Sequence, residues 1–558
     1  MRMSTTSRAR SRAHRPITTH RPTHRAMPPA STAIAAFAML VASPAAQAFT
    51  ADTSRCTTSY LSGVAPAGVT VQTASIVAAA TSTPEHCRVL ASVPTPGNTV
   101  AFVAGFPTTW NEKLVWASQG GLAGQPMNLT GSFLQAGYAT GVTDTGHQGS
   151  ATAIGGASRD ASFVYDPQKL TDYGHRANHV AVDAAKALIS GYYTTEIKRS
   201  IFNACSNGGR SVMINAQRYP GQFDGYVVGA PVISWTQNAL DWLLHSGRGF
   251  FAKPTSFPTA AKLQLVGKAV LDACDDDDGV RDGVVSNPLA CRFDPRVLQC
   301  GGADAPDCLT KDQVDAFVTW STDVRNSNGE LVSHRWLFTG TEGEATGTTV
   351  YQVGPNPPQL DANGVPLISS SQNNGFSLVN GVLRDMVYQD PAYDVRRFDI
   401  ESDMGVLAQA EGFVGASDTN LLPAANKGAK FLFYHGWGDP ALNPLNTVDY
   451  YHALVQRYGE EKTNGFVRMF FVPGMTHCSG GVGATDTFDT NAAMERWLDT
   501  GVAPDRLDAA KISSGTVTRT KPLCAFPRYP AYRLTAGADD AYGKDDAFYY
   551  YCADPSAP

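Results

Sequence analysis

Hydrophobic and polar residues follow one another in two blocks of the chain that predict buried strands and amphipathic helices. In the first block, from about Cys56 to Trp235, short apolar runs predict strands, and apolar residues at helical spacing predict helices. The predicted elements are a strand at 113–117, a helix at 178–189, a strand at 199–203, a helix at 210–218 and a strand at 226–228. Strand, helix and strand in this order form a βαβ unit, which implies a parallel sheet.

The second block begins near Ala429 and repeats this pattern. Apolar runs predict strands at 431–434 and 467–472. Between them, five apolar residues fall on one helical face: Val448, Tyr451, Leu454, Val455 and Tyr458. A last helix at 492–498 is followed by Gly501, which can cap it. The two blocks are therefore interpreted as two parts of one α/β fold.

The middle of the chain, residues 234–426, breaks this rhythm. It is rich in Asn, Asp, Gly, Pro and Thr and contains four cysteines. A chain of 558 residues also exceeds one ordinary core. We interpret the middle as an insertion between the first part of a sheet domain, 49–233, and its second part, 427–558. The alternative is an independent domain.

The first 48 residues have the pattern of a secretory signal. They contain seven arginines, no lysine and no acidic residue, followed by an apolar run from Ala33 to Ala42 and the small-residue triplet 46–48. The apolar run is too short to span a bilayer, although an uncleaved anchor is the alternative. We therefore expect 1–48 to be a signal peptide and the mature chain to be secreted or periplasmic.

Composition and charge narrow the classes of partner. Hydrophobic residues make up 43% and charged residues 17%, which is typical of a globular chain. Removing the seven arginines of the signal takes the formal charge from −6 to −13. So acidic a chain is not expected to bind nucleic acid or an anionic membrane. Its oligomeric state is left open.

Ten cysteines fall in the predicted mature chain, and an even number in an exported protein predicts disulfides. None has the Cys-x-x-Cys spacing of a zinc site. No His/Asp cluster has the spacing of a catalytic zinc site either, which argues against a metal-dependent hydrolase. The ten are Cys56, Cys87, Cys205, Cys274, Cys291, Cys300, Cys308, Cys478, Cys524 and Cys552.

A candidate nucleophile lies where a predicted strand turns into a helix. The segment Asn203–Arg210 carries Ser206 between the small residues Ala204 and Gly208, a modified form of the Gly-x-Ser-x-Gly nucleophile elbow. The following helix directs its N-terminus at the serine, and the N–H of Asn207 is expected to donate to a developing oxyanion. The alternative is a serine that caps a buried helix.

Two later loops supply candidates for the acid and the base. Asp439 follows the first strand of the second block, and His477 follows the second strand. This is the chain order Ser, Asp, His of α/β-hydrolases, with each residue at the carboxyl end of a strand. The nearest rivals are His435, which we expect to support the loop, and Asp449.

These residue types predict nucleophilic ester hydrolysis. Ser206 is expected to attack an ester carbonyl, His477 to take up and return the proton, and Asp439 to orient the imidazole. A second oxyanion donor is expected from the glycine turn after the early strand, at Gly121 or Gly120.

Cysteines flank the nucleophile and the base: Cys205 precedes the serine and Cys478 follows the histidine. This arrangement resembles the tannase and feruloyl esterase family of α/β-hydrolases, which includes terephthalate monoester hydrolases. The resemblance implies a disulfide between these two cysteines. Departures are Ala204 where the family has glycine and Asn207 where threonine is common, which put the oxyanion geometry in doubt.

Further stretches carry the same resemblance over essentially the whole mature chain. They are 216–220, 223–225, 229–231, 473–478 and 521–524. The resemblance implies a disulfide between Cys524 and Cys552. It also implies that residues 234–426 form a lid domain, which covers the active site and supplies most substrate contacts.

An acidic loop at 274–284 matches a calcium site of this family. Oxygen ligands in a glycine-bearing loop suit Ca²⁺, and the spacing is not that of an EF-hand. The alternative is a solvated acidic loop. The resemblance implies a structural ion, and no organic cofactor is expected. The expected ligands are Asp275, Asp278, the Val280 carbonyl, Asp282 and the Val284 carbonyl.

The sequence therefore predicts a serine esterase with an α/β-hydrolase fold, acting on small esters of phenolic acids such as ferulate, chlorogenate or gallate. Alternatives are a terephthalate monoester or another aryl ester as substrate, and a protease. An alternative of another class is a non-catalytic, calcium-dependent binding protein. Arg384, Trp336 and Phe376 are candidates for substrate contact, and each is equally well explained as structural.

Overall fold

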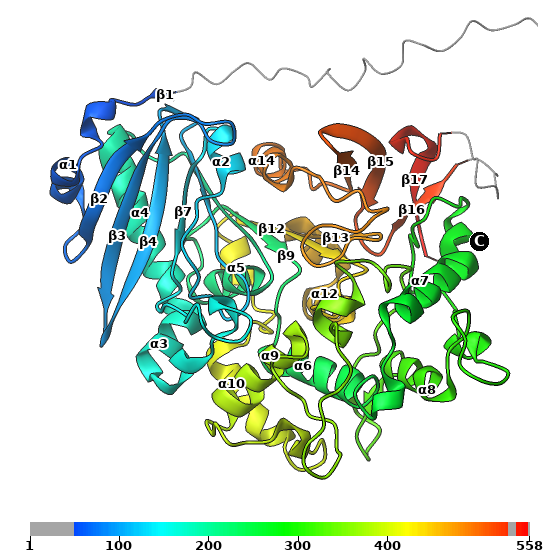
Figure 1. Cartoon of the computed structure of the whole chain (residues 1–558). Coiled ribbons are helices and arrows are strands. Elements are labelled where there is room, and N and C mark those ends of the chain that lie inside the picture. Colours follow the sequence, from blue (N-terminus) through cyan, green and yellow to red (C-terminus); the bar gives the residue numbers. More distant parts are fainter. Residues whose placement is uncertain (1–48, 534–542, 556–558) are drawn as a thin grey trace, which may run out of the picture. The chain divides into compact units, whose positions relative to one another are not determined.

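The computed structural model describes residues 49–533 and 543–555, and the predicted signal peptide lies outside them. The described residues contain a mixed sheet of nine strands, which lie side by side in the order β13-β12-β9-β8-β6-β7-β4-β3-β2 (Figure 1). Its strands are β2 (Thr70–Val77), β3 (His86–Thr95), β4 (Asn98–Pro107), β6 (Lys113–Trp116), β7 (Ala139–Thr143), β8 (Arg199–Cys205), β9 (Gly225–Gly229), β12 (Lys430–Gly436) and β13 (Val467–Val472).

The six strands from β7 to β13 are parallel, as the βαβ pattern predicted. The sequence did not predict β7. It also did not predict β2, β3 and β4, which pair antiparallel and extend the sheet through an antiparallel pairing of β4 with β7. Both predicted blocks thus contribute to one sheet, joined where β12 pairs with β9. The carboxyl ends of β8, β12 and β13 consequently lie at the same edge.

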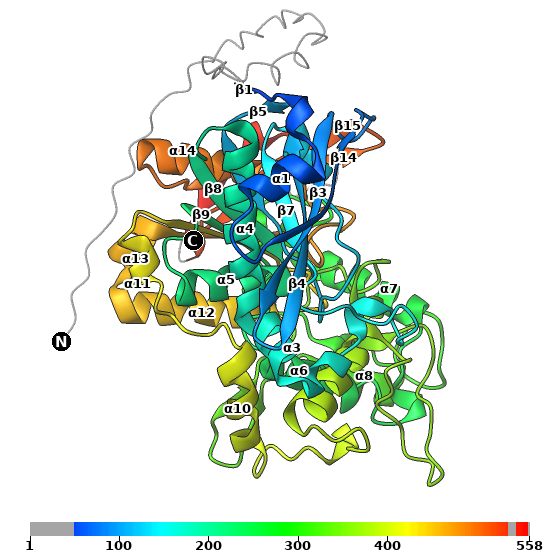
Figure 2. The ribbon, with the colours of Figure 1, turned by 90° about the vertical axis from the view of Figure 1, so that its left-hand side faces the viewer.

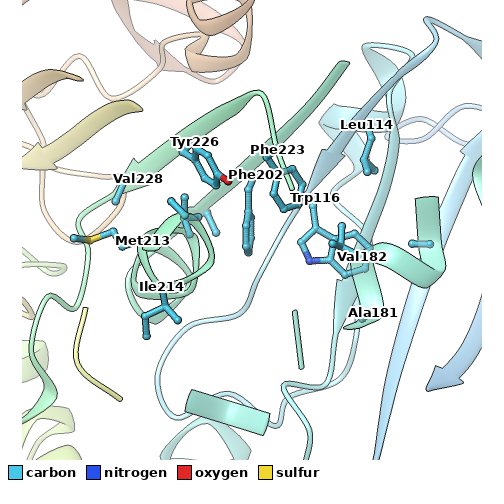
Figure 3. Packing of buried hydrophobic residues seen from close by; sticks show 14 of the residues in the cluster. Leu114, Trp116, Ala181, Val182, Phe202, Met213, Ile214, Phe223, Tyr226 and Val228 are labelled. Carbon is cyan, nitrogen blue, oxygen red and sulfur yellow. The ribbon is translucent and has the colours of Figure 1, made fainter. Parts of the chain in front are cut away.

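Alternate residues of the parallel strands enter two different cores, because side chains of a strand point to opposite faces. Phe202, Tyr226 and Phe431 pack with helices α4 (Ala177–Tyr193), α5 (Asn207–Arg218) and α12 (Pro444–Tyr458). Figure 3 shows part of this cluster. Their neighbours pack on the other face with α14 (Thr490–Thr500) and the hairpin of β14 (Arg506–Ser513) and β15 (Thr516–Cys524); these neighbours are Ile201, Val227 and Leu432.

The middle of the chain forms a largely helical region with its own hydrophobic core (Figures 1 and 2). Loops between Leu122 and Tyr173 of the first block also contribute to this core, and the described residues form one compact unit. The predicted boundaries at 234 and 426 stay a prediction. The main helices of this middle region are α6 (Trp235–Asp241), α7 (Ala260–Cys274), α8 (Lys311–Trp320), α9 (Asn374–Val379) and α10 (Met404–Val414).

Boundaries of the predicted elements differ by a few residues from those of the structure. The helix predicted at 210–218 begins at Asn207, directly after the candidate nucleophile. Gly501 caps α14 in the left-handed conformation, at φ 72°, as predicted. Within the described ranges, no helix is long and apolar enough to cross a membrane.

Candidate active site

Ser206 stands at a sharp turn between the carboxyl end of β8 and the first residue of α5. Its backbone has φ 67° and ψ −130°, a strained conformation for a residue with a side chain. Two backbone hydrogen bonds maintain it: the Ser206 N–H donates to the Gly229 carbonyl at 3.0 Å, and the Val232 N–H donates to the Ser206 carbonyl at 3.2 Å. The turn therefore presents the Ser206 hydroxyl at the edge of the sheet, as in a nucleophile elbow.

Small residues around the turn explain how alanine can replace glycine before the serine. A Cβ atom at Gly208 would lie 2.8 Å from the Ala204 Cβ and 2.9 Å from the Ser118 carbonyl oxygen. The absence of a side chain at Gly208 leaves the room that the Ala204 methyl group occupies. The departure at position 204 is thus compatible with a tight elbow.

Asp439 and His477 lie within hydrogen-bonding distance in the order that the sequence predicted. The His477 Nε2 lies 2.9 Å from the Ser206 Oγ, and its Nδ1 lies 2.8 Å from the Asp439 Oδ2. With the proton on Nδ1, the ring donates to the carboxylate and accepts from the hydroxyl, which is the tautomer that a general base requires.

Asp439 is fully buried and held in a single orientation. Its Oδ1 accepts the backbone N–H groups of Ala441 and Leu442 at 2.8 and 3.0 Å. Burial alone raises the pKa of this carboxyl, but attraction to His477 and hydrogen bonds from His435 and His477 outweigh it, so the pKa lies well below its ordinary value. Asp439 therefore stays ionised where it can orient and stabilise a protonated His477.

The two rivals occupy other places. His435 is buried, with Nδ1 2.9 Å from the Thr447 hydroxyl and Nε2 3.2 Å from Asp439, so it supports the acid loop. Asp449 pairs with His334 at 2.5 Å, away from His477.

The glycine turn after β6 faces the nucleophile. The Ser206 Cβ and Oγ are the closest atoms to a Cβ placed on Gly120, at 3.9 and 4.0 Å. Gly121 has φ 60°, and a Cβ there would lie 2.4 Å from the Ser158 carbonyl oxygen, so no larger residue fits. The turn and the free first N–H groups of α5 thus approach Ser206 from two sides.

The side chain of Asn207 connects these two sides, a role that the sequence analysis missed. Its Nδ2 donates to the Gln119 carbonyl at 3.0 Å, next to the glycine turn. Its Oδ1 accepts from the Tyr173 hydroxyl at 2.9 Å and from the Arg210 Nε at 2.7 Å. Asn207 and Arg210 are both fully buried, so these contacts are shielded from water.

All ten cysteines form disulfides, which are Cys56–Cys87, Cys205–Cys478, Cys274–Cys291, Cys300–Cys308 and Cys524–Cys552. The second bridge, with a Cα–Cα distance of 6.1 Å, joins the residue before the nucleophile to the residue after the base. Both pairings that the family resemblance implied are present.

The middle segment contacts the candidate site through Tyr351. Its ring meets the His477 ring edge-on, with centroids 5.6 Å apart. The three residues considered for substrate contact are placed differently. Trp336 and Phe376 are 3% and 0% exposed within the core of the segment, and Arg384 forms a two-pronged ion pair with Asp385 at 2.8 Å.

The acidic loop gathers buried carboxylates around a lysine. The Lys521 Nζ lies 3.1 Å from Asp278 Oδ2, 3.0 Å from Asp282 Oδ2 and 2.8 Å from the Ser286 hydroxyl. Asp275 accepts the backbone N–H groups of residues 282, 283 and 284.

The carboxylates of the acidic loop meet some of the requirements of a cation site, but not all of them. The Oδ1 of Asp282 is buried without a hydrogen-bond partner among the described residues, and oxygen donors match Ca²⁺. However, among all the residues that the structure describes, no group of three or more His, Cys, Asp or Glu side chains is arranged to hold a metal ion. The calcium site therefore stays a prediction, with the Lys521 ammonium as the competing counter-charge.

Comparisons with known proteins agree over most of the chain. Residues 87–545 match the family model described as tannase and feruloyl esterase. An uncharacterized esterase of Xanthomonas campestris pv. campestris is 32% identical over 507 residues, 82% of this chain and 84% of that protein. A mono(2-hydroxyethyl) terephthalate hydrolase of Piscinibacter sakaiensis is 30% identical over 513 residues, with coverages of 82% and 84%.

Solved structures show the same fold. Feruloyl esterase B from Aspergillus oryzae superimposes with a TM-score of 0.75 at 22% identity, covering 90% of this chain and all of the other. Tannin acyl hydrolase from Aspergillus niger gives a TM-score of 0.69 at 19% identity, with coverages of 91% and 96%. The fold predicted from the sequence is thereby confirmed.

Proposed function

Since the chain belongs to the tannase and feruloyl esterase family of α/β-hydrolases and is a carboxylic ester hydrolase, we propose that it cleaves small aromatic esters through a Ser206–His477–Asp439 triad. One observation carries the proposal: an unbroken hydrogen-bonded chain runs from the Ser206 hydroxyl through His477 to a buried, ionised Asp439. The chain ends at a serine in a strained elbow, which is where a nucleophile is needed.

In acylation, the Ser206 Oγ attacks the ester carbonyl carbon while His477 Nε2 takes the hydroxyl proton. Negative charge then develops on the carbonyl oxygen. The N–H of Asn207 and that of Gly121, or of Gly120, are the proposed donors to this oxyanion. Collapse of the tetrahedral intermediate breaks the bond to the alcohol, which receives the proton from His477.

In deacylation, a water molecule replaces the alcohol. His477 takes a proton from the water, which attacks the acyl-enzyme carbonyl, and returning that proton to Ser206 releases the acid. Asp439 stabilises the imidazolium in both steps. The proposed steps use side chains and backbone N–H groups of this protein, the ester and water, and they require no organic cofactor.

Esters of phenolic acids are the proposed substrates, of the ferulate, chlorogenate or gallate type. The support is the family, whose members include proteins named feruloyl esterase and tannin acyl hydrolase. A terephthalate monoester is the second candidate, since one relative at 30% identity is named for that activity. A calcium-dependent binding protein without activity is disfavoured, because the geometry of a triad is retained.

We further propose export of the enzyme and a lid formed by residues 234–426. Five disulfides suit an oxidising compartment, outside the cell or in the periplasm, and the segment 1–48 is the proposed signal. Contact of Tyr351 with His477 supports the lid. The proposed binding partners are small aromatic esters, and we propose no binding to nucleic acid or to a membrane. Calcium is proposed as a structural ligand.

A substrate screen tests the function directly. Purified enzyme is assayed on methyl ferulate, chlorogenate, methyl gallate, a terephthalate monoester and a long-chain acyl ester. We expect at least one aromatic ester to be cleaved with a kcat/KM well above that of the long-chain ester. Asp439→Asn should abolish this activity and Asp449→Asn should retain it. A preference for long acyl chains would contradict the proposed substrate class.

A further inference from the structure

One arginine beside the glycine turn has no part in the triad. Arg159 ends a short 3₁₀ turn, Ala157–Arg159, whose Ser158 carbonyl accepts the N–H of Leu122 at 3.1 Å. A Cβ on Gly121 would lie only 2.8 Å from the Arg159 Nη1. The guanidinium therefore packs directly against the turn that faces Ser206.

Arg159 also approaches the base through the middle segment. Its guanidinium lies 5.7 Å from the Tyr351 ring centroid, and its Nη2 lies 3.4 Å from the Tyr351 hydroxyl. Tyr351 in turn contacts His477 edge-on. Arg159 thus contacts the proposed oxyanion turn directly and is separated from the proposed base, His477, by one residue, Tyr351.

The positive charge of Arg159 is not neutralised by a carboxylate. Among the residues that the structure describes, Arg159 forms no ion pair. Its Nη1 donates to the Ser158 carbonyl at 3.3 Å and its Nη2 to the Tyr351 hydroxyl, whereas its Nε is buried without a hydrogen-bond partner. The adjacent Asp160 is occupied, since its carboxylate accepts the backbone N–H groups of Ser150 and Ser162, both at 2.8 Å. A half-buried guanidinium that no carboxylate neutralises is costly, and an anionic ligand would lower that cost.

Arg159 lines part of a cavity of about 330 Å³, which is large enough for part of a small ester. It contains a second arginine, Arg384, whose charge is balanced by Asp385 at 2.8 Å. Apolar atoms of Ile154 and Ala161 form other parts of its wall. The cavity thus combines apolar surface with two arginines and the carboxylates of Asp160 and Asp385. Of the two arginines, only Arg159 has no carboxylate partner among the described residues, and it also packs against Gly121 of the turn that faces Ser206.

From this geometry we propose that Arg159 is a specificity-determining residue that binds a carboxylate of the ester substrate. The inference rests on the proposed esterase function and names a substrate class for the same site: esters that carry a free carboxylate on either the acid or the alcohol part. Guanidinium and carboxylate match in shape and charge, and their hydrogen bonds are among the strong ones. Neutral esters bind without this contact.

Two matched pairs of esters test the proposal. The first pair is monomethyl and dimethyl terephthalate, in which the carboxylate sits on the acid part. The second is chlorogenate and its methyl ester, in which it sits on the alcohol part. We expect the wild-type enzyme to prefer the anionic member of at least one pair, and the responding pair identifies which part of the ester faces Arg159.

Arg159→Gln should reduce that preference by about tenfold or more, mainly through KM, because a hydrogen bond to a charged group is lost. Arg159→Lys should retain part of the preference, which separates the charge from the packing of the side chain. The double variant Arg384→Gln/Asp385→Asn is the matched control: it removes the paired arginine of the same cavity together with its partner, so the net charge of the cavity and the anionic-to-neutral ratio should not change.

An equal loss for both members of each pair in Arg159→Gln, or no anionic preference in the wild type, would overturn the assignment of Arg159 while leaving the esterase intact. Failure of the wild type to cleave any of the four esters and those of the screen would instead overturn the proposed function, and this inference with it.

Discussion

At the scale of single residues, the amide side chain of Asn207 explains how the elbow around Ser206 can be organised with asparagine where the family commonly has threonine. Asn207 bridges the Gln119 carbonyl, the Tyr173 hydroxyl and the Arg210 guanidinium, and so fixes the first N–H of α5 relative to the glycine turn. A donor that moves by a fraction of an ångström weakens oxyanion stabilisation.

Asn207→Ala should therefore lower kcat by about tenfold or more and leave KM nearly unchanged. The measurement is steady-state kinetics on the best ester of the screen. Asn215→Ala is the control, since Asn215 is also buried in α5 but bonds to Gln222, two turns from the nucleophile. Similar losses of kcat in both variants would mean that Asn207 acts only through stability.

The sequence predicted the three residues of the proposed triad, which the structure brings together, because their signal is local: each residue follows a strand, in a fixed chain order. The contact of Asn207 with Tyr173 and that of Arg159 with Tyr351 join residues 34 and 192 positions apart, and nothing in the local pattern marks them. For the same reason, Trp336 and Phe376 resembled substrate contacts in the sequence, whereas their burial shows them packed in a core.

At the scale of elements, the predicted strands and helices of both blocks are present, because long buried runs and helical spacing are strong signals. The antiparallel strands β2, β3 and β4 were missed. Arg88 and Thr95 interrupt the apolar pattern of β3, and β2 is exposed at most positions as the edge strand. The residue pattern of an exposed edge strand depends on its pairing with the neighbouring strand, which cannot be read from the sequence of the edge strand alone.

The disulfide between Cys205 and Cys478 ties the end of β8 to the loop after β13. It closes a separation of 273 residues, worth on the order of 5 kcal/mol in the chain-entropy model. It also holds the nucleophile and base loops together. Replacing both cysteines by alanine should therefore lower kcat more than a loss of stability alone explains.

The control is the double alanine variant of Cys300 and Cys308, a bridge in the middle segment. Activity is measured well below both melting temperatures. If the two double variants keep the same kcat, the bridge beside the triad has no organising role.

A buried glutamate makes the packing of α7 dependent on pH. Glu342 is 1% exposed, and burial raises its pKa to about 7 from 4.5. Its Oε2 has no hydrogen-bond partner among the described residues and faces Gly267 of α7. Because the folded pKa exceeds the unfolded one, stability falls as pH rises from about 4.5 to about 7 and levels off above, by up to about 3 kcal/mol.

Glu342→Gln should remove this part of the pH dependence. Chemical unfolding at pH 5 and pH 8 is compared for both proteins, and the difference between the two pH values should shrink in the variant. Glu461→Gln, at an exposed position on α13 (Glu460–Phe466), is the control. An unchanged difference in Glu342→Gln would show that Glu342 is ionised at little cost in the folded protein.

At the scale of the whole molecule, the acidic loop joins the middle of the chain to its C-terminal end. Asp278 and Asp282 contact Lys521 of β15, and Asp282 accepts the Tyr550 hydroxyl at 3.0 Å from β17 (Tyr550–Ala553). These partners are more than 230 positions apart in the sequence. A cation at this junction would stabilise the whole fold.

If calcium binds there, adding a chelator should lower the melting temperature, and Asp275→Ala should abolish that response. Thermal unfolding with and without chelator is the measurement. Asp304→Ala, at a carboxylate that pairs with Lys262 outside this loop, is the control and should keep the response. A melting curve that chelation does not change would contradict the calcium prediction and leave the Lys521 ammonium as the counter-charge.

The central claim is that Ser206 is the nucleophile of a serine esterase. The most direct measurement is mass spectrometry of peptides after reaction with a fluorophosphonate, which modifies activated serines. We expect one adduct, on the peptide containing Ser206, formed in parallel with the loss of ester hydrolysis. Ser206→Ala should neither react nor hydrolyse esters, although it folds normally. An adduct on another serine, or near-native hydrolysis by Ser206→Ala, would contradict the account.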